Sequence, residues 1–391
     1  MDKGYFYFKM RSILKLLLLL LLITPVFGQG DHIVYLIGDA GEDSIPGLAL
    51  ESLRKEITEH PNSTTIFLGD NIYPRGSYKE NSNKGKRDNP KLVAQMSLFK
   101  NGYPGNVFFV PGNHDWKKSR PNGLMFIKRQ GDFVDKYLRE NSQIKNIETG
   151  IYLPKRGGLG PEIRKIEYGG GVIKLIFFDT QWYLQKTFIH KVNKPDGIST
   201  VDYLDQQLKV LKKEVDQSDQ NLEQVIVVAH HPLFTIGSHG LAKPGYRILN
   251  ILDLPFFGVL GTFRLVSQNL SGRRYRVLQK KLVQILDHKN VIYAAGHEHN
   301  LQYWRKGNMH QIVSGSGSKT TEYFKKATNN PWNSNASLEF PILESKKQAS
   351  KLGYFKLIFN TSGELEIRVI EISDEGNISC MILFPSKTMC K

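Results

Sequence analysis

Cysteine is nearly absent from this chain: only Cys380 and Cys390 occur, both close to the C-terminus. Two cysteines are too few for a disulfide framework, and we exclude a cysteine-based zinc site. In an exported protein the two could pair with each other and close a small terminal loop. Any bound metal must therefore rest on histidine, carboxylate, amide or phenolate ligands.

The sequence also lacks internal repeats, low-complexity tracts and any signature of DNA or RNA binding. Its 391 residues, 40% hydrophobic and 23% charged, are ordinary for a globular protein and exclude wholesale disorder. The formal net charge is +16, of which the four basic residues and one acidic residue in positions 1–28 contribute +3. A basic surface attracts anions, so phosphorylated small molecules and anionic lipids or membrane surfaces are the expected partners, although an ordinary solvated surface can carry similar charge. Specific nucleic-acid binding is not expected.

A hydrophobic run at residues 13–23 is flanked by basic side chains and followed by the small residue Gly28. This pattern predicts a signal peptide at residues 1–28 that is removed on export, which would leave a single mature domain at 29–391. A membrane anchor is the alternative, although the run is shorter than the about 20 apolar residues that a spanning helix needs. An exported chain would be periplasmic, secreted or associated with the cell envelope.

Apolar, β-branched segments alternate with segments of helical spacing along the rest of the chain. Strands are predicted at 32–39, 64–70, 106–115, 171–181, 223–232, 290–299, 310–318, 353–360 and 364–372. Helices are predicted at 48–60, 91–100, 202–215 and 273–288, and a polar loop at 71–90. Strands that alternate with helices indicate a layered α/β core, and the segment from 350 onward is rich in strands.

One long apolar segment, residues 241–266, has no clear period, and the insertion around it extends to about residue 272. It is either a loop with a short helix packed on the body of the domain, or a hydrophobic lid or membrane-touching segment.

Five of the predicted strands end in a polar cluster. The clusters read GDAG from 38, GDNIY from 69, GNHD from 112, AHHP from 229 and GHEH from 296. Any one of them alone could be a turn or a helix cap. Together they place oxygen and nitrogen donors beside glycines, which let the backbone turn sharply, at strand ends that share one edge of a sheet. We therefore expect the five clusters to converge on one site, although they lie far apart in the sequence.

The donors in these clusters are hard oxygens and imidazoles, a set that suits Fe, Mn or Zn. They are too numerous for one ion. A pair of ions about 3.5–4 Å apart, bridged by a carboxylate, would use them all, and such pairs cleave phosphate esters.

In this order, the clusters resemble the motifs of the calcineurin-like metallophosphoesterases: GDxG, GDxxY, GNH[DE], a histidine after a strand, and GHxH. Within that family the chain is most similar to the small, tartrate-resistant type of purple acid phosphatase, which reads GNHD and GHDHNLQY where this chain reads GNHD and GHEHNLQY. The resemblance covers about residues 32–318. It implies a four-layer α/β/β/α sandwich of two mixed sheets flanked by helices.

The resemblance also implies two metal ions, Fe(III) and a divalent Fe, Zn or Mn ion. Their implied ligands are Asp39, Tyr73 and His299 for Fe(III), Asn113, His230 and His297 for the divalent ion, and Asp70 as the bridge. His230 is preferred over His231 because the family places its ligand first in the His-x-Pro step. Alternate residues of an extended chain share a face, so His297 and His299 can each serve a different ion.

Tyr73 bears most directly on metal identity, because relatives without this tyrosine bind Mn, Zn or Fe(II) at that position. A phenolate is a hard, anionic ligand that favours trivalent iron and gives a visible charge-transfer colour. The alternative is a tyrosine that only packs under its loop.

Two further histidines are candidate catalytic residues. His114 follows Asn113 and could protonate the leaving alkoxide or bind the phosphoryl oxygens. His239, in TIGSHG, matches a histidine that follows a glutamate in the small acid phosphatases, but Ser238 stands here in place of that glutamate. The departure puts the details of proton transfer in doubt.

The first hypothesis is therefore an exported, acid-phosphatase-like enzyme that hydrolyses phosphomonoesters by in-line attack of a metal-activated hydroxide. One alternative is a phosphodiesterase or pyrophosphatase that acts on nucleotides or lipid head groups. Another is an envelope binding module that keeps a metal site without turnover, although the complete ligand set argues against it.

Overall fold

The computed structural model describes residues 30–100, 102–185, 192–241, 270, 272–329 and 333–390. The predicted signal peptide and nearly all of the apolar insertion predicted at 241–272 lie outside these residues. Their predicted roles therefore stay predictions.

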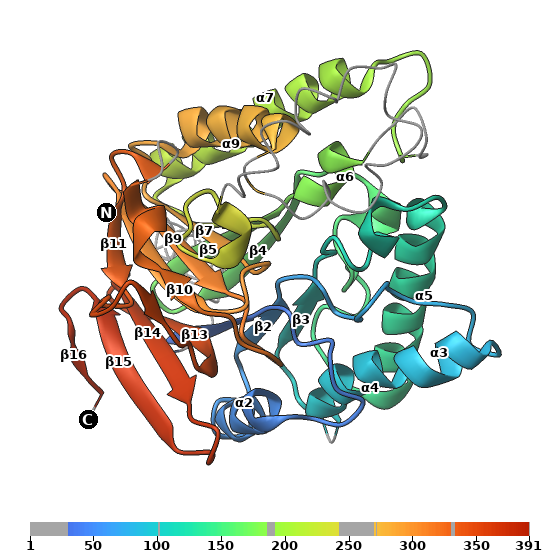
Figure 1. Cartoon of the computed structure of the whole chain (residues 1–391), viewed down its shortest axis with the longest axis horizontal. Coiled ribbons are helices and arrows are strands. Elements are labelled where there is room, and N and C mark those ends of the chain that lie inside the picture. The colour runs from blue at the N-terminus through green and yellow to red at the C-terminus, as the bar shows by residue number, and fades with distance from the viewer. Residues whose placement is uncertain are drawn as a thin grey trace, which may run out of the picture.

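The first sheet contains seven strands in the order β16-β15-β14-β13-β1-β2-β3 (Figure 1). Its strands are β1 (His32–Ile37), β2 (Thr64–Phe67), β3 (Asn106–Phe109), β13 (Leu352–Phe359), β14 (Leu365–Ile372), β15 (Ile378–Phe384) and β16 (Thr388–Met389). Strands β1, β2 and β3 are parallel, and β13 pairs antiparallel with β1. The C-terminal strands thus join the strand that begins the described fold.

The second sheet also contains seven strands, in the order β11-β8-β9-β7-β6-β5-β4. Its strands are β4 (Glu162–Tyr168), β5 (Gly171–Phe177), β6 (Gln224–Val228), β7 (Val291–Ala295), β8 (Leu301–Lys306), β9 (Met309–Ser314) and β11 (Ser337–Phe340). Strands β5, β6, β7 and β9 are parallel, and the outer strands β4, β8 and β11 are antiparallel to their neighbours. A separate two-stranded pair joins β10 (Tyr323–Phe324) to β12 (Lys347–Gln348).

Helices cover the outer faces of the two sheets (Figure 1). Their bounds are α2 (Leu48–Glu59), α3 (Asn83–Asp88), α4 (Pro90–Met96), α5 (Gly123–Asn141), α6 (Thr180–Leu184), α7 (Thr200–Asn221) and α9 (Arg273–Leu286). Helices α2, α4 and α5 lie on the side of the first sheet, and α7 and α9 run along the second. None of the described helices is long and apolar enough to cross a membrane.

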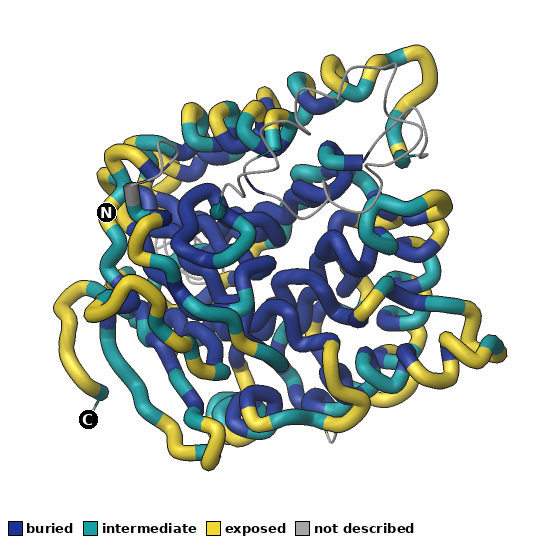
Figure 2. The backbone as a smooth tube through the Cα atoms, in the orientation of Figure 1, coloured by how far each residue is buried: buried dark blue, intermediate teal, exposed yellow. Residues whose placement is uncertain are grey.

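The alternation of side chains along β1 explains why the sheets stack. Val34 and Leu36 belong to an apolar cluster shared by both sheets, whereas Tyr35 and Ile37 pack in a cluster that includes the helices. Successive strand residues point to opposite faces, so one strand contributes to both clusters. Figure 2 shows the central strands buried, whereas the helices, the turns and the C-terminal edge strands β15 and β16 carry partly or fully exposed backbone. This arrangement confirms the predicted sandwich of two mixed sheets flanked by helices.

Two local features differ from, or complete, the sequence-based expectations. Residues 71–90 were expected to form a loop, but they contain α3, whose first turn is capped because the Ser82 hydroxyl accepts a hydrogen bond from the Gly85 backbone N–H at 3.0 Å. The pairing of Cys380 with Cys390, left open by the sequence, is present as a disulfide with Cα atoms 5.4 Å apart.

Candidate metal centre

The polar clusters lie beyond the C-terminal ends of five parallel strands. Asp39, Asp70 and Asn113 follow β1, β2 and β3 of the first sheet, and His230 and the pair His297 and His299 follow β6 and β7 of the second. The site therefore forms where the two sheets face each other, at the end of the sandwich where crossover connections leave loops free to bind ligands.

Three side chains from both sheets meet in a first group. The Tyr73 hydroxyl donates to Asp39 Oδ1 at 2.7 Å and lies 3.1 Å from His299 Nε2. His299 Nε2 is 3.5 Å from Asp39 Oδ1. Asp39 and Tyr73 are buried, and His299 is slightly exposed. A carboxylate, a phenol and an imidazole thus point at one place, as ligands of a hard cation do.

A second group contains Asn113, His230 and His297, all buried. Asn113 Oδ1 lies 3.1 Å from His230 Nε2 and 3.0 Å from His297 Nδ1, and those two nitrogens are 3.3 Å apart. His230 Nδ1 must donate to the Leu68 carbonyl, at 2.7 Å, because a carbonyl only accepts. Neutral His230 therefore presents a lone pair at Nε2, which is the form that binds metals.

Asp70 lies between the two groups. Its Oδ1 is 3.5 Å from His230 Nε2, and it shares a possible metal-binding cluster with Asp39 and His230. Burial raises the pKa of Asp70 to about 8, and the charge of Asp39 adds to this effect. Two carboxylates crowded away from water need compensating positive charge, which a cation between them would supply.

The backbone of these loops is bent in a way that few side chains tolerate. Asp39, Asp70 and His297 have φ angles of 56°, 55° and 72°, in the left-handed region. Non-glycine residues there cost on the order of 1 kcal/mol each, and such strain collects at functional sites. Gly112 is required beside Asp70, because a Cβ at that position would lie 2.2 Å from Asp70 Oδ1.

Asp115 holds the loop after β2 to the loop after β3, a role that the sequence alone did not reveal. Its buried carboxylate accepts hydrogen bonds from the backbone N–H groups of Asn71, Ile72 and Gly112, and from Gln130 Nε2 at 2.9 Å. The only sequence signal was an acidic residue at the end of GNHD.

Both candidate catalytic histidines lie beside these groups. His114 Nδ1 donates to the Pro74 carbonyl at 2.9 Å, and its Nε2 lies 3.8 Å from Asp70 Oδ2. Burial lowers the pKa of His114 well below its usual value. The ring of His239 is centred 4.5 Å from the ring of His297. His231 lies beside the second group, but its Nδ1 is hydrogen-bonded to the Thr180 hydroxyl at 2.7 Å. That nitrogen therefore does not join Asn113 and His230 in the second group.

Four basic side chains lie near the site, and we call Arg75, Lys118, Arg120 and Lys319 the cationic rim. Lys118 and Lys319 act electrostatically on His114, Lys319 also acts on Asp70, and Arg75 and Arg120 act on Lys118. Burial lowers the pKa of Lys118, and repulsion from the other three members contributes, whereas attraction to Asp70 opposes the shift. The ammonium group of Lys319 lies 3.1 Å from the centre of the Tyr73 ring.

The loop that carries Lys118 is unusual in its backbone. Lys117, Lys118 and Ser119 have φ angles of 59°, 54° and 53°. The Lys118 backbone N–H donates to the Asn113 carbonyl at 2.8 Å, and Ser119 Oγ accepts from Gln181 Nε2 at 2.8 Å. These bonds fix the lysine next to the GNHD loop.

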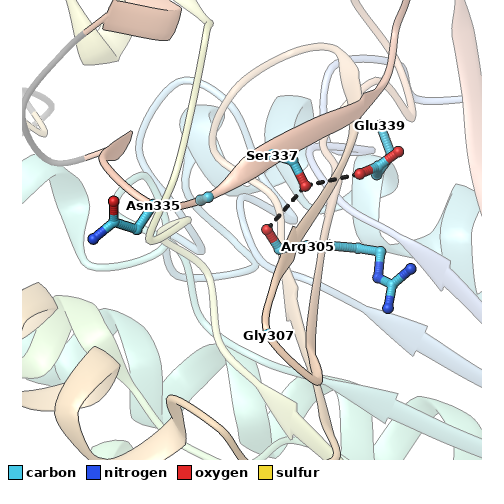
Figure 3. A pocket seen from close by; sticks show the side chains of 6 residues that line it. Arg305, Gly307, Asn335, Ser337 and Glu339 are labelled. Carbon is cyan, nitrogen blue, oxygen red and sulfur yellow. Dashed lines mark hydrogen bonds between the residues drawn. The ribbon is translucent and has the colours of Figure 1, made fainter.

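A separate cavity of about 400 Å³ lies at the β8–β11 edge of the second sheet (Figure 3). Its lining residues are Arg305, Gly307, Asn335, Ala336, Ser337 and Glu339. None of the candidate ligands lines it. Ser337 Oγ donates to Glu339 Oε1 at 2.8 Å there.

The strand order of the two sheets, together with the grouped oxygen and imidazole donors, is typical of metal-dependent phosphoesterases. A profile of the calcineurin-like phosphoesterase family matches residues 34–301, more than half of the chain, and the chain belongs to that family. No curated protein matches significantly.

Solved structures with a related fold are distant in sequence. The GAP50 anchor in the inner membrane complex of Plasmodium is 15% identical, with a TM-score of 0.52 over 93% of this chain and 90% of that chain. A dimetal phosphatase from Danio rerio is 14% identical, with a TM-score of 0.41 over 84% of this chain and 95% of that chain. A 5'-nucleotidase from Staphylococcus aureus, described as putative, is 12% identical, with a TM-score of 0.41 over 92% of this chain and 54% of that chain. At these identities the likeness concerns the fold alone.

Proposed function

We propose that the protein is an exported dimetal phosphoric ester hydrolase that prefers phosphomonoesters. The observation that carries this proposal is the division of the donors into two groups, each built from both sheets, with Asp70 between them. A lone structural ion would need only one of these groups.

The donor chemistry fits two different ions. Asp39, Tyr73 and His299 would hold Fe(III), because a carboxylate and a phenolate are hard anionic ligands. Asn113, His230 and His297, with fewer charges, would hold a divalent Fe, Zn or Mn ion, and Asp70 would contact both. When bound, such a pair supplies Lewis acidity and an activated water for in-line attack at phosphorus.

The chain's own residues would complete the reaction. His114 Nδ1 donates to the Pro74 carbonyl, so Nε2 of the neutral ring carries a lone pair and faces outward from that bond. Only once the ring is protonated could Nε2 bind a phosphoryl oxygen or deliver a proton to the leaving oxygen. The His239 ring lies next to the His297 ring. The cationic rim attracts anionic esters. A phosphomonoester carries nearly two negative charges at neutral pH and a diester carries one, so the rim favours the monoester.

The test is hydrolysis of p-nitrophenyl phosphate beside bis-p-nitrophenyl phosphate by the mature chain supplied with iron and zinc. Faster monoester turnover, abolished by Asp70→Asn and Asn113→Ala, supports the proposal. Asp219→Asn and Asn83→Ala are the matched controls, because both residues lie on exposed helical surfaces away from the described donors.

The other outcomes separate the alternatives. Faster diester turnover would point to a phosphodiesterase or pyrophosphatase acting on nucleotides or lipid head groups. Absence of turnover in metal-loaded protein would favour a non-catalytic envelope module, and the Plasmodium protein, described as an anchor, would then be the relevant comparison. Export and contact of residues 241–266 with anionic lipid are further proposals. N-terminal sequencing of the secreted protein and liposome sedimentation test them.

A further inference from the structure

The glutamate between the two candidate ligand histidines points away from both groups of metal donors. Glu298 is completely buried. Its neighbours His297 and His299 take part in the two donor groups, whereas the Glu298 carboxylate bonds residues of a different loop, 235–240. A fully buried carboxylate needs several donors to offset its loss of water.

Within the part of the chain that the structure describes, the donors to the Glu298 carboxylate come from residues 235–240. They are the Thr235 hydroxyl at 3.1 Å, the His239 backbone N–H at 3.2 Å, His239 Nδ1 at 3.1 Å and the Gly240 backbone N–H at 3.0 Å. An ionised carboxylate has about four acceptor positions, so its capacity is filled by this one loop.

The loop approaches the carboxylate as closely as a backbone can. A Cβ on Gly237 would lie 2.1 Å from Glu298 Oε2, so a glycine is required there. Ser238 stands where the similar small acid phosphatases have a glutamate next to this histidine, and a serine has no carboxylate to offer. In this chain the partner of His239 comes instead from the loop after β7.

We propose that Glu298 positions His239, holding the imidazole by Nδ1 so that Nε2 is turned toward the candidate metal centre. The role rests on the proposed phosphoesterase function. With Nδ1–H donated to Glu298, the opposite ring nitrogen is the atom available for substrate, in the way that a buried carboxylate fixes a histidine tautomer in other hydrolases.

The position of the ring agrees with this orientation. The His239 ring is centred 4.5 Å from the His297 ring and 5.8 Å from the His299 ring. Its side chain keeps 21% of its surface exposed while Glu298 keeps none. The ring thus lies between the Glu298 carboxylate and the two candidate ligands.

A double-mutant cycle tests the proposal. Wild type, Glu298→Gln, His239→Ala and the double variant are compared on a phenyl phosphate with a poor leaving group. Glu298→Gln removes the negative charge and can present an amide NH₂ to Nδ1, so the imidazole is no longer held. We expect kcat to fall about 10–100-fold, which is part of the effect typical of general acid–base groups, and KM to change less. In the His239→Ala background the same change should lower kcat by less than about twofold, since coupled residues are not additive.

The control is Glu56→Gln, which removes a charge from a partly buried ion pair between α2 and Lys356 of β13, neither of which carries a candidate ligand. It should lower stability and leave kcat unchanged. Metal content is measured for every variant. Independent, multiplicative losses in the cycle, or ions lost from Glu298→Gln, would show that Glu298 supports the metal ligands and not His239.

A second measurement needs no variant. In zinc-loaded protein with ¹⁵N-labelled histidine, the ring spectra should show the His239 proton on Nδ1. A neutral ring protonated only on Nε2 would overturn the proposal even if Glu298→Gln did not fold. A wild-type protein that hydrolyses no phosphate ester would overturn the proposed function, while the tautomer would still report on the Glu298 contact.

Discussion

Gly112→Ala is the sharpest test of the geometry around Asp70. The added Cβ would lie 2.2 Å from Asp70 Oδ1 and 2.3 Å from the Asp70 backbone nitrogen, whereas ordinary contacts begin at 3.4 Å. The backbone of Gly112 cannot retreat freely, because its N–H donates to Asp115 Oδ2 at 2.8 Å. The carboxylate must therefore move by about 1 Å or more.

The size of the effect follows from that displacement. A misplacement of about 1 Å in a catalytic centre costs about 100-fold in rate, and overpacking costs about 1–3 kcal/mol in the free energy of unfolding. We expect Gly112→Ala to bind metal less tightly and to lose about 100-fold in turnover of p-nitrophenyl phosphate. Both are measured on the same preparation, by metal titration and by initial rates.

Gly131→Ala is the matched control. Gly131 lies inside α5, and a Cβ there would meet Tyr152 at 3.4 Å, an ordinary contact. Alanine is the better helix former by about 0.5–1 kcal/mol, so this variant should be slightly more stable and fully active. Wild-type turnover and metal binding in Gly112→Ala would refute the placement of Asp70 between the two donor groups.

Four further changes test separate contacts. Tyr73→Phe should abolish the visible absorption of the oxidised, iron-loaded protein, and a colourless wild type loaded with Fe(III) would contradict phenolate ligation. His114→Ala should slow poor leaving groups more than p-nitrophenolate, since protonation matters most for basic leaving oxygens, and equal losses would indicate phosphate binding instead. Lys118→Ala should raise KM about 3–10-fold and weaken the dependence of KM on salt concentration, because salt screens long-range attraction. Exposed Lys213→Ala is the control. An unchanged salt dependence would show that Lys118 does not attract the substrate. Burial alone would raise the pKa of Glu223, but hydrogen bonds from two lysines lower it to about 2. Its stabilisation is therefore present above the unfolded pKa of 4.5 and lost as the pH falls toward 2. The difference in unfolding free energy between wild type and Glu223→Gln, measured by urea titration, should shrink by about 1–2 kcal/mol over that range, because solvent screens part of the attraction to the lysines. A pH-independent difference would contradict this pKa.

The strand ends were predictable because their pattern is local. A short apolar run followed by glycine and a polar residue reads as a buried strand and its exit loop, and topology then brings such exits together. That reasoning grouped Asp39, Asn113 and His297 before any contact was known. It could not have placed Tyr73 within 2.7 Å of Asp39, since that distance depends on how two loops fold against each other.

Other features depended on contacts that no local pattern records. Helix α3 was missed because its sequence, NKGKRD, is polar and contains Gly85, and the helix is set by the Ser82 cap. The roles of Asp115 and Glu298 were missed because both bind backbone groups of loops distant in sequence. Periodicity tells which way a side chain points and not what it meets.

Each group of candidate ligands contains side chains from both sheets, and this arrangement has a thermodynamic consequence. Separation of the two sheets would remove ligands from each ion at once. Ions that bind the folded chain and not the unfolded one would therefore stabilise the contact between the sheets. Free metal at 1,000 times its dissociation constant would add about 4 kcal/mol. The supply of metal would then govern how long the folded protein persists as well as how fast it hydrolyses its substrate.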